Sequence, residues 1–248
     1  MKSTSTSHPV AYSTKLVTKL TLVKTAAPAA VFYANIILMN ITETIENIIK
    51  SDEFVLSETK KIQYGYGLKR VIRYIVERNE EIATESVAEH VYALHLLADY
   101  FLPLEDQNHT MDWTKVHDML QYHDIDEIET GDIIGYLKTD ADREAEETAA
   151  EKVLASFPAH LQPKVHAINE EYNAQQSPEA KFAKALDRIE PVFQIYNDNG
   201  KKIMHLQKTT KEQAHHHKAP YVSDYPCLKR FFEVIEATMD KEGFYQPE

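Results

Sequence analysis

Hydrophobic residues recur every three to four positions along most of the chain, and this spacing predicts amphipathic helices rather than strands. In the segment that follows Ser86, the residues Leu94 and Phe101 share one helical stripe with His90. Ser86 begins a capping-box pattern, which predicts the start of this helix, and Pro103 predicts its end shortly after Phe101. We therefore expect His90 to point into an apolar interior.

The same periodicity predicts helices along most of the remaining chain. Glycines interrupt one of them at Gly65 and Gly67, and the stretch 197–225 is polar, so we expect it to be irregular. Glycine is scarce and no internal repeat is found, which favours helices joined by short loops. The sequence thus predicts an all-α helical bundle. The expected helices span residues 41–49, 60–78, 86–101, 113–128, 141–157, 161–174, 177–196 and 226–239.

The first forty residues differ in composition from the rest, since no acidic residue occurs before Glu43. Three interpretations stay open. The segment could be a transit peptide, although it has no Arg, or a secretory signal whose apolar run lies unusually far from the start. It could also result from a misassigned start, with Met39 as the true first residue, and this is the interpretation we favour. We expect residues 1–40 to form a non-core extension and 41–248 a single domain.

The overall charge limits the partners of the protein. The formal net charge is -12, which disfavours binding to nucleic acid and to anionic membranes. The apolar run at 26–39 is too short and interrupted to span a bilayer. With Cys227 as the single cysteine, an internal disulfide and a multi-thiolate metal site are both excluded. These features favour a cytoplasmic protein that takes a small-molecule ligand.

Four residues have types and positions that complement one another: His90, the adjacent pair His123 and Asp124, and Asp187. Each has an ordinary explanation by itself, such as a hydrogen-bonded core histidine or a boundary aspartate in an ion pair. Together they predict a site at which two imidazoles and two carboxylates bind one divalent cation, because burying these groups unpaired is costly. Such a set suits Mn, Co, Fe, Ni or Mg better than a closed structural zinc site.

The segments around these residues resemble the HD phosphohydrolase superfamily, named after its central His-Asp pair. Residues 86–90, 123–132 and 177–187 are similar to the three metal-binding segments of HD-type 5'-deoxynucleotidases. The resemblance covers roughly residues 41–199. It implies an HD-domain helical bundle in which the four residues ligate the metal. These ligands would be His90, His123, Asp124 and Asp187.

The resemblance also implies roles for further residues. Glu127 would take part in proton transfer, while Asp132 would contact substrate and orient the attacking water. Arg73 and Tyr74 match an Arg–aromatic pair that binds phosphate and substrate. Asp124 and Asp187 would also contact the substrate. Two departures bear on substrate choice: Tyr74 replaces the usual Trp, and residues 134–135 are Ile-Gly where bacterial enzymes carry Pro-Thr.

Simpler explanations exist for the accessory residues. Glu127 could be a solvated acid at a helix end, and Asp132 a turn residue beside a glycine. Arg73 could form a surface ion pair with Glu77. We interpret the three consecutive histidines 215–217 as surface residues in a polar loop.

The sequence-based hypothesis is a metal-dependent phosphomonoester hydrolase, with deoxyribonucleoside 5'-monophosphates as the implied substrates and a homodimer as the assembly suggested by analogy. One alternative is an HD-type phosphodiesterase or nucleotide pyrophosphohydrolase. Another is a non-enzymatic regulator that binds a metal or nucleotide. The presence of both Glu127 and Asp132 disfavours the regulator.

Overall fold

The computed structural model describes residues 41–74, 78, 82, 84–133 and 139–247. The chain divides into two compact units, residues 1–51 and 52–248. In the first unit the described residues form a helix over 41–50. The expected extension 1–40 lies outside the described residues, and a single domain beginning at residue 41 stays a prediction.

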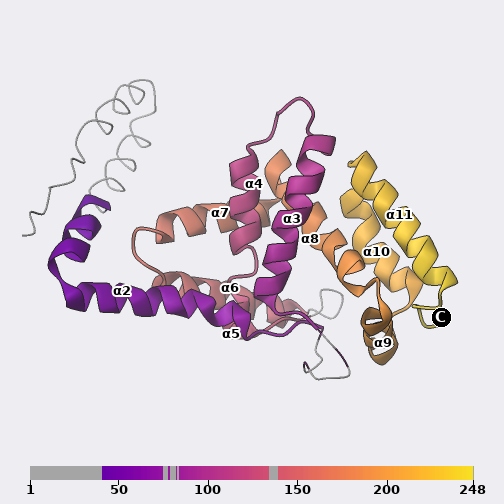
Figure 1. Ribbon diagram of the computed structural model, residues 1–248, viewed down its shortest axis with the longest axis horizontal. Coiled ribbons are helices and arrows are strands. Elements are labelled where there is room, and N and C mark those ends of the chain that lie inside the picture. The colour runs from indigo at the N-terminus through magenta and orange to yellow at the C-terminus, as the bar shows by residue number, and fades with distance from the viewer. Residues whose placement is uncertain (1–40, 75–77, 79–81, 83, 134–138, 248) are drawn as a thin grey trace, which may run out of the picture. The chain divides into compact units, whose positions relative to one another are not determined.

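The second unit is built from helices, and the predicted all-α fold is confirmed (Figure 1). Its described residues form no strand beyond two isolated β-bridges. No described helix is long and apolar enough to cross a membrane. The elements are α2 (Asp52–Gly65), the 3-10 helix η2 (Tyr66–Lys69), α3 (Val87–Glu105), α4 (Trp113–Tyr122), α5 (Glu127–Thr130), α6 (Asp140–Ser156), α7 (Gln162–Ala174), α8 (Pro178–Ile195), α9 (Asp198–Gln207), α10 (Lys211–Val222) and α11 (Pro226–Lys241).

Helix α8 lies at the centre of this unit, packed against α3, α4, α7, α9, α10 and α11. Phe182, Leu186 and Ile189 on α8 are fully buried in the main hydrophobic core. Leu94 of α3 and Leu120 of α4 fill the same core. Because α8 contacts helices from both halves of the unit, residues on its different faces can meet groups that are far apart in the sequence.

The start of α3 follows the predicted capping box. The Ser86 hydroxyl accepts a hydrogen bond from the Glu89 backbone N–H, and the Glu89 carboxylate accepts one from the Ser86 N–H at 2.6 Å. The predicted end at Pro103 is wrong, since α3 continues to Glu105. A proline so close to the end of a helix disturbs a single turn, through its missing N–H and through its ring. The Asp106 N–H still donates to Leu102 O at 2.8 Å.

The predicted helix 113–128 is divided into α4 and the short α5. Between them the backbone makes tighter bonds, from Ile125 N to Tyr122 O and from Glu127 N to Asp124 O. Such i→i+3 bonds are typical of a chain that leaves the α-helical path. Because of this break, His123 and Asp124 both point toward α8. In a continuous helix these two adjacent side chains would point in different directions around the helix axis.

Residues 197–225 are helical, so their predicted irregularity is wrong. Asn197 caps α9, and its side chain accepts from Gly200 N. Thr210 and Gln213 form a second capping box that starts α10. These local signals were present in the sequence, but the low hydrophobicity of the segment masked them. Helix α10 packs directly against α8 and α11, which gives this polar stretch a structural role.

The predicted helix 60–78 is shifted toward the N-terminus. Helix α2 begins at Asp52 and ends at Gly65, and the chain leaves helical geometry after η2. At Gly67 a Cβ atom would lie 2.9 Å from Ile128 Cγ2, so only glycine lets this turn approach α5 so closely. This approach places the segment that follows, with Arg73 and Tyr74, beside the start of α3, where Arg73 N donates to Glu85 O.

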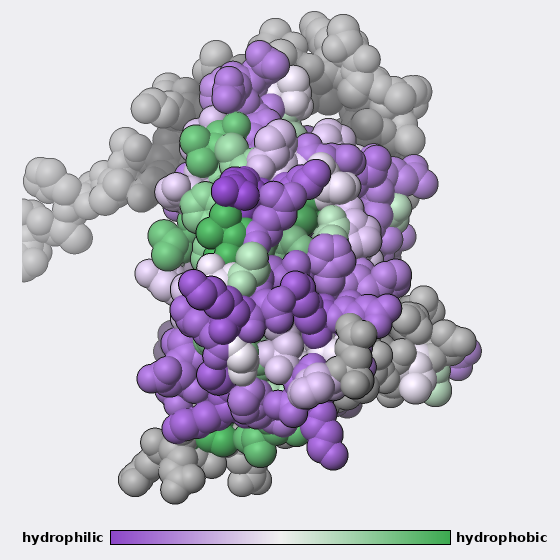
Figure 2. All heavy atoms as spheres, turned by 90° about the vertical axis from the view of Figure 1, so that its right-hand side faces the viewer, coloured by the Kyte–Doolittle hydropathy of each residue, from purple (hydrophilic) through white to green (hydrophobic). Residues whose placement is uncertain are grey.

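The surface on the side of the C-terminal helices is mostly polar (Figure 2). Figure 2 faces the C-terminal helices and shows a mostly hydrophilic surface in which hydrophobic residues form small, separate patches. Hydrophobic residues scattered in this way are ordinary for a folded domain.

Two leucines provide a test of this packing. Leu94 of α3 is 0% exposed and Leu206 of α9 is 60% exposed. We expect Leu94→Ala to lower the free energy of unfolding by about 2–5 kcal/mol, because it leaves a cavity in the core. Leu206→Ala should change it by less than about 0.5 kcal/mol. Urea denaturation of both variants measures the difference, and equal effects would contradict the arrangement of α3.

Candidate metal centre

Four side chains from three parts of the bundle bring nitrogen or oxygen atoms to one point. They are His90 in the first turn of α3, His123 and Asp124 after α4, and Asp187 of α8, and their candidate ligand atoms lie within 4.8 Å of one another. His123 Nε2 is 2.9 Å from Asp124 Oδ2, and His90 Nε2 is 3.4 Å from Asp187 Oδ1. Adjacent ligands about 2.1 Å from an octahedral cation are about 3.0 Å apart, so this spacing fits one metal ion.

Both histidines have one ring nitrogen engaged by an acceptor behind the site. His123 Nδ1 donates to the Leu120 carbonyl oxygen at 3.1 Å, and His90 Nδ1 lies 2.8 Å from a Glu190 carboxylate oxygen. The Nε2 atoms of both rings are buried and make no hydrogen bond within the described part of the chain. A second partner that fixes the ring and leaves Nε2 for the ion is typical of metal-binding histidines. The residues present therefore fit a metal ion.

The charges around this point favour a cation. Burial lowers the pKa of His123, but Asp124 and Asp187 outweigh this effect and raise it to about 10. Burial would raise the pKa of Asp124, yet His123 holds it well below its ordinary value. The carboxylates thus stabilise positive charge here, and either a protonated imidazole or a divalent ion can supply it.

The site is open on one side. The side chains of His90 and His123 are fully buried, whereas those of Asp124 and Asp187 are 21% and 12% exposed. Both carboxylates line a cavity of about 340 Å³, a volume at the low end of the range for small-ligand pockets. A closed structural metal site would have no such opening, so this geometry is typical of catalytic centres.

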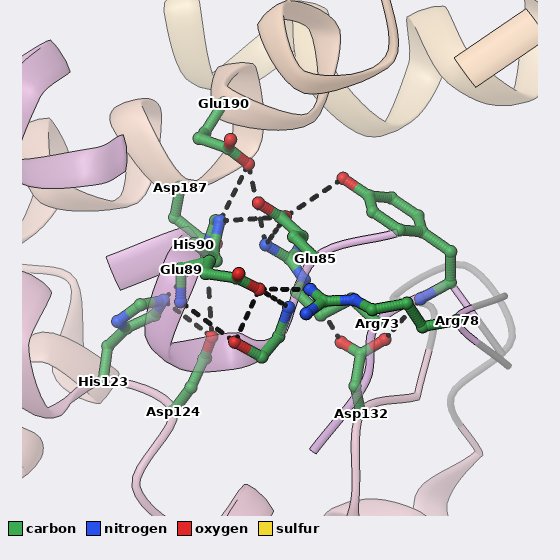
Figure 3. A network of polar contacts seen from close by, with 12 residues as sticks. Arg73, Arg78, Glu85, Glu89, His90, His123, Asp124, Asp132, Asp187 and Glu190 are labelled. Carbon is green, nitrogen blue, oxygen red and sulfur yellow. Dashed lines mark hydrogen bonds and ion pairs between the residues drawn. The ribbon is translucent and has the colours of Figure 1, made fainter. Parts of the chain in front are cut away.

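A second cluster of acids lies behind His90. Glu85, Glu190 and His90 also bring candidate ligand atoms together, but the guanidinium of Arg73 already occupies this cluster. Arg73 Nη1 lies 3.0 Å from Glu85 and 3.6 Å from Glu190, and Arg73 Nε lies 3.6 Å from Asp132. Figure 3 shows Glu85 and Arg73 on the side of His90 opposite to His123. A cation is therefore present here without a metal, and the cluster serves to hold His90 and Arg73.

Burial in this acidic cluster affects the ionisation of Glu85. Burial and the neighbouring Glu190 raise the pKa of Glu85 to about 7, against the lowering effects of Arg73 and His90. Near neutral pH the Glu85 carboxyl group is therefore partly protonated and partly ionised.

The remaining predicted site residues also lie at the cavity. Glu127, Asp132, Arg73 and Tyr74 all line it. Glu127 is 4% exposed, so it is not a solvated acid. Asp132 accepts a hydrogen bond from Tyr74 N at 3.1 Å, and the Tyr74 hydroxyl lies 3.3 Å from Glu85. Tyr74 has a φ of 71°, an uncommon backbone conformation for a bulky residue. Glu77, the alternative partner of Arg73, lies outside the described residues.

Sequence reasoning missed Glu85 and Glu190. The signal for Glu190 was its position three residues after Asp187, which places both on one face of α8. The three histidines 215–217 lie in helix α10, so the predicted loop is wrong. His215 and His216 are exposed as predicted, whereas His217 lines the cavity.

Comparison with known proteins fits this geometry. Residues 66–228 match the HD domain family. The chain belongs to the HD-domain family. It is 33% identical over 145 residues to the "5'-deoxynucleotidase HDDC2" of Bos taurus, covering 56% of this chain and 68% of the relative. The Mus musculus protein of the same name is 28% identical over 158 residues, with 58% and 76% covered.

A solved structure supports the fold. A crystal structure of a "predicted metal-dependent phosphohydrolase" from Magnetospirillum magnetotacticum aligns with a TM-score of 0.66 and 22% identity, covering 78% of this chain and 98% of that one. The family match and the similar relatives confirm the predicted membership of the HD metal-dependent phosphohydrolase superfamily and the resemblance to 5'-deoxynucleotidases.

The carboxylate behind His90 can be tested. Glu190→Gln keeps the shape of the side chain but removes the charge that holds His90 Nδ1. We expect the affinity for Mn²⁺ or Co²⁺ to fall about 10–100-fold, the usual effect of losing such a partner. Glu179→Gln is the matched control, because Glu179 is also buried on α8 but contacts Asp112 N and does not line the cavity. Equal affinities in metal titrations of the two variants would contradict this role.

Proposed function

We propose that the protein is a metal-dependent 5'-deoxynucleotidase that releases phosphate from deoxyribonucleoside 5'-monophosphates. The observation that carries the proposal is the convergence of two imidazoles and two carboxylates where the cavity opens. The relatives named 5'-deoxynucleotidase support the substrate class, at 28–33% identity.

The proposed metal ligands are His90 Nε2, His123 Nε2 and one oxygen each of Asp124 and Asp187. This mixed nitrogen and oxygen set suits Mn, Co, Fe, Ni or Mg. When bound, the cation supplies Lewis acidity toward a phosphoryl oxygen and an activated water. Asp124 and Asp187 are the ligands that reach the cavity, so they would also lie closest to the substrate phosphate.

The accessory residues would act around the phosphate. Glu127 is buried beside the metal ligands and would give a proton to the leaving 5'-oxygen. Asp132 would orient the attacking water. Arg73 and Tyr74 would contact the substrate from the wall near Asp132, where the acids around Arg73 hold its guanidinium in place.

Assembly and location belong to the same proposal. We infer a homodimer in the cytoplasm that binds neither nucleic acid nor membranes. The exposed stripe Tyr92, Leu96, Tyr100 and Leu104 on α3 supports a contact between two copies, because residues four apart share one helix face.

Phosphate release from matched nucleotides tests the function. Protein loaded with Mn²⁺ or Co²⁺ should hydrolyse deoxyribonucleoside 5'-monophosphates and leave the ribonucleotides largely intact. Asp124→Asn should abolish release and bound metal together, whereas Asp224→Asn, at an exposed position on the C-terminal side, should change neither. Release from diesters or pyrophosphates instead of monophosphates would contradict the substrate class.

The role of Glu127 has its own test. Glu127→Gln keeps the size of the side chain but cannot donate the proton. We expect kcat to fall about 10²–10⁴-fold, with metal content and KM unchanged. Steady-state kinetics and metal analysis on the same preparation check this result. A loss of metal in the variant would instead assign Glu127 to the metal site.

A further inference from the structure

One wall of the cavity is basic, although the protein as a whole is acidic. Arg188 of α8 and Lys218 of α10 line it, together with His217. Arg188 directly follows Asp187 on α8, whereas His217 and Lys218 lie on α10. None of these three residues has a role in the proposed hydrolysis.

Among the described residues, Arg188 contacts a histidine and a tyrosine rather than a carboxylate. One of its Nη atoms contacts His217 Nε2, and its guanidinium carbon lies 5.1 Å from the centre of the Tyr221 ring. Its Nε atom is buried and makes no hydrogen bond, and within the described residues no carboxylate lies within 4 Å. Burial and the charges of Arg188 and Lys218 lower the pKa of His217 to about 4, so this imidazole is neutral and accepts from Arg188.

Lys218 is a buried cation on the same wall. It is only 9% exposed, and among the described residues it makes no hydrogen bond or ion pair. Burial and Arg188 lower its pKa to about 8, which leaves it protonated at neutral pH. The acid that acts on it from a distance is Glu236, which is hydrogen-bonded to His215.

Lys218 is buried and Arg188 is half-buried, and neither has a carboxylate within 4 Å among the described residues, although buried charges are normally paired. The contrast with Arg73 is informative, because three carboxylates surround that guanidinium. The positive charge that remains open to an anion in the cavity therefore comes from Arg188 and Lys218. Arg and Lys are the residues that bind phosphate and carboxylate groups most strongly.

The basic wall lies beside the metal centre. Lys218 lies on α10, which carries none of the four candidate metal ligands, whereas Arg188 follows the ligand Asp187 on α8. We therefore infer that an anion on Lys218 would be a group separate from the phosphate at the metal. Lys184, which also lines the cavity, is already bound to Asp187 at 2.8 Å and belongs to the metal side.

We propose that Arg188 and Lys218 form an anion subsite that binds a second phosphate or carboxylate group of the substrate. The proposal rests on the proposed function for the first phosphate. It implies that a monoester carrying another anionic group, such as a nucleoside bisphosphate, binds better than a simple monophosphate.

A first experiment measures anion binding without turnover. The metal-loaded protein, its Lys218→Met and Arg188→Gln variants, and the exposed control Lys181→Met of α8 are melted with and without inorganic phosphate. We expect Lys218→Met to raise the melting temperature in the absence of phosphate, because it removes a buried unpaired charge. It should also lose part of the phosphate-induced rise that the control retains.

A second experiment compares deoxyadenosine 5'-monophosphate with deoxyadenosine 3',5'-bisphosphate as substrates. The wild type should have a KM about tenfold or more lower for the bisphosphate, the effect expected of one charge-assisted contact. Lys218→Met and Arg188→Gln should remove this advantage and leave the KM for the monophosphate unchanged. Lys218→Arg keeps the positive charge and should retain the lower KM for the bisphosphate.

The two experiments separate the outcomes. If phosphate raises the melting temperature of Lys218→Met and Arg188→Gln as much as that of the wild type, the subsite is overturned, whether or not the enzyme hydrolyses nucleotides. A reduced rise with equal KM values for the two substrates would overturn the second-anion assignment and place the hydrolysed phosphate on this wall. A reduced rise without any hydrolysis would retain the subsite and overturn the nucleotidase proposal.

Discussion

Charge balance at the junction of α3, α4 and α8 is the constraint on which the site depends. Two carboxylates and two imidazoles meet there at separations of 2.9–3.9 Å, with both rings buried. Carboxylates at this depth are stable only next to positive charge. The helix packing supplies rigid positions, and the break after α4 lets two adjacent residues face the same point. The fold therefore creates a site for a cation before any substrate binds.

The same constraint extends outward from the site. Glu190 fixes His90, and Arg73 in turn compensates Glu190, Glu85 and Asp132. The chain segment with Arg73 can reach this position because Gly67 allows η2 to approach Ile128 closely. A change in the outer part of this network would thus alter the orientation of His90, although the changed residue would not touch the metal. Substrate contacts by Arg73 have to occur within this ionic network.

The sequence predicted those parts of the site that depend on local patterns. The capping box at Ser86 and the stripe through Leu94 placed His90 correctly, and the His123–Asp124 pair was recognisable by itself. Pro103 and the segment 197–225 were predicted wrongly, because a proline near a helix end does not stop the helix at once and because capping residues start helices even in a polar segment. The pairing of Arg188 with His217 joins α8 to α10, and no periodicity within either helix reveals such a contact.

The cavity has opposite charges on its walls, and this asymmetry bears on how a ligand would lie. Asp124, Asp187, Glu127 and Asp132 make one part acidic, so an anion is favourable there only at a bound cation. Arg188 and Lys218 attract an anion directly. A neutral sugar or base between two anionic groups would match this order of charges, whereas a ligand with one phosphate would leave a buried cation unpaired. Specificity in this protein would then arise from the cost of that unpaired charge, because a site built to pair a charged group discriminates most strongly against ligands that lack it.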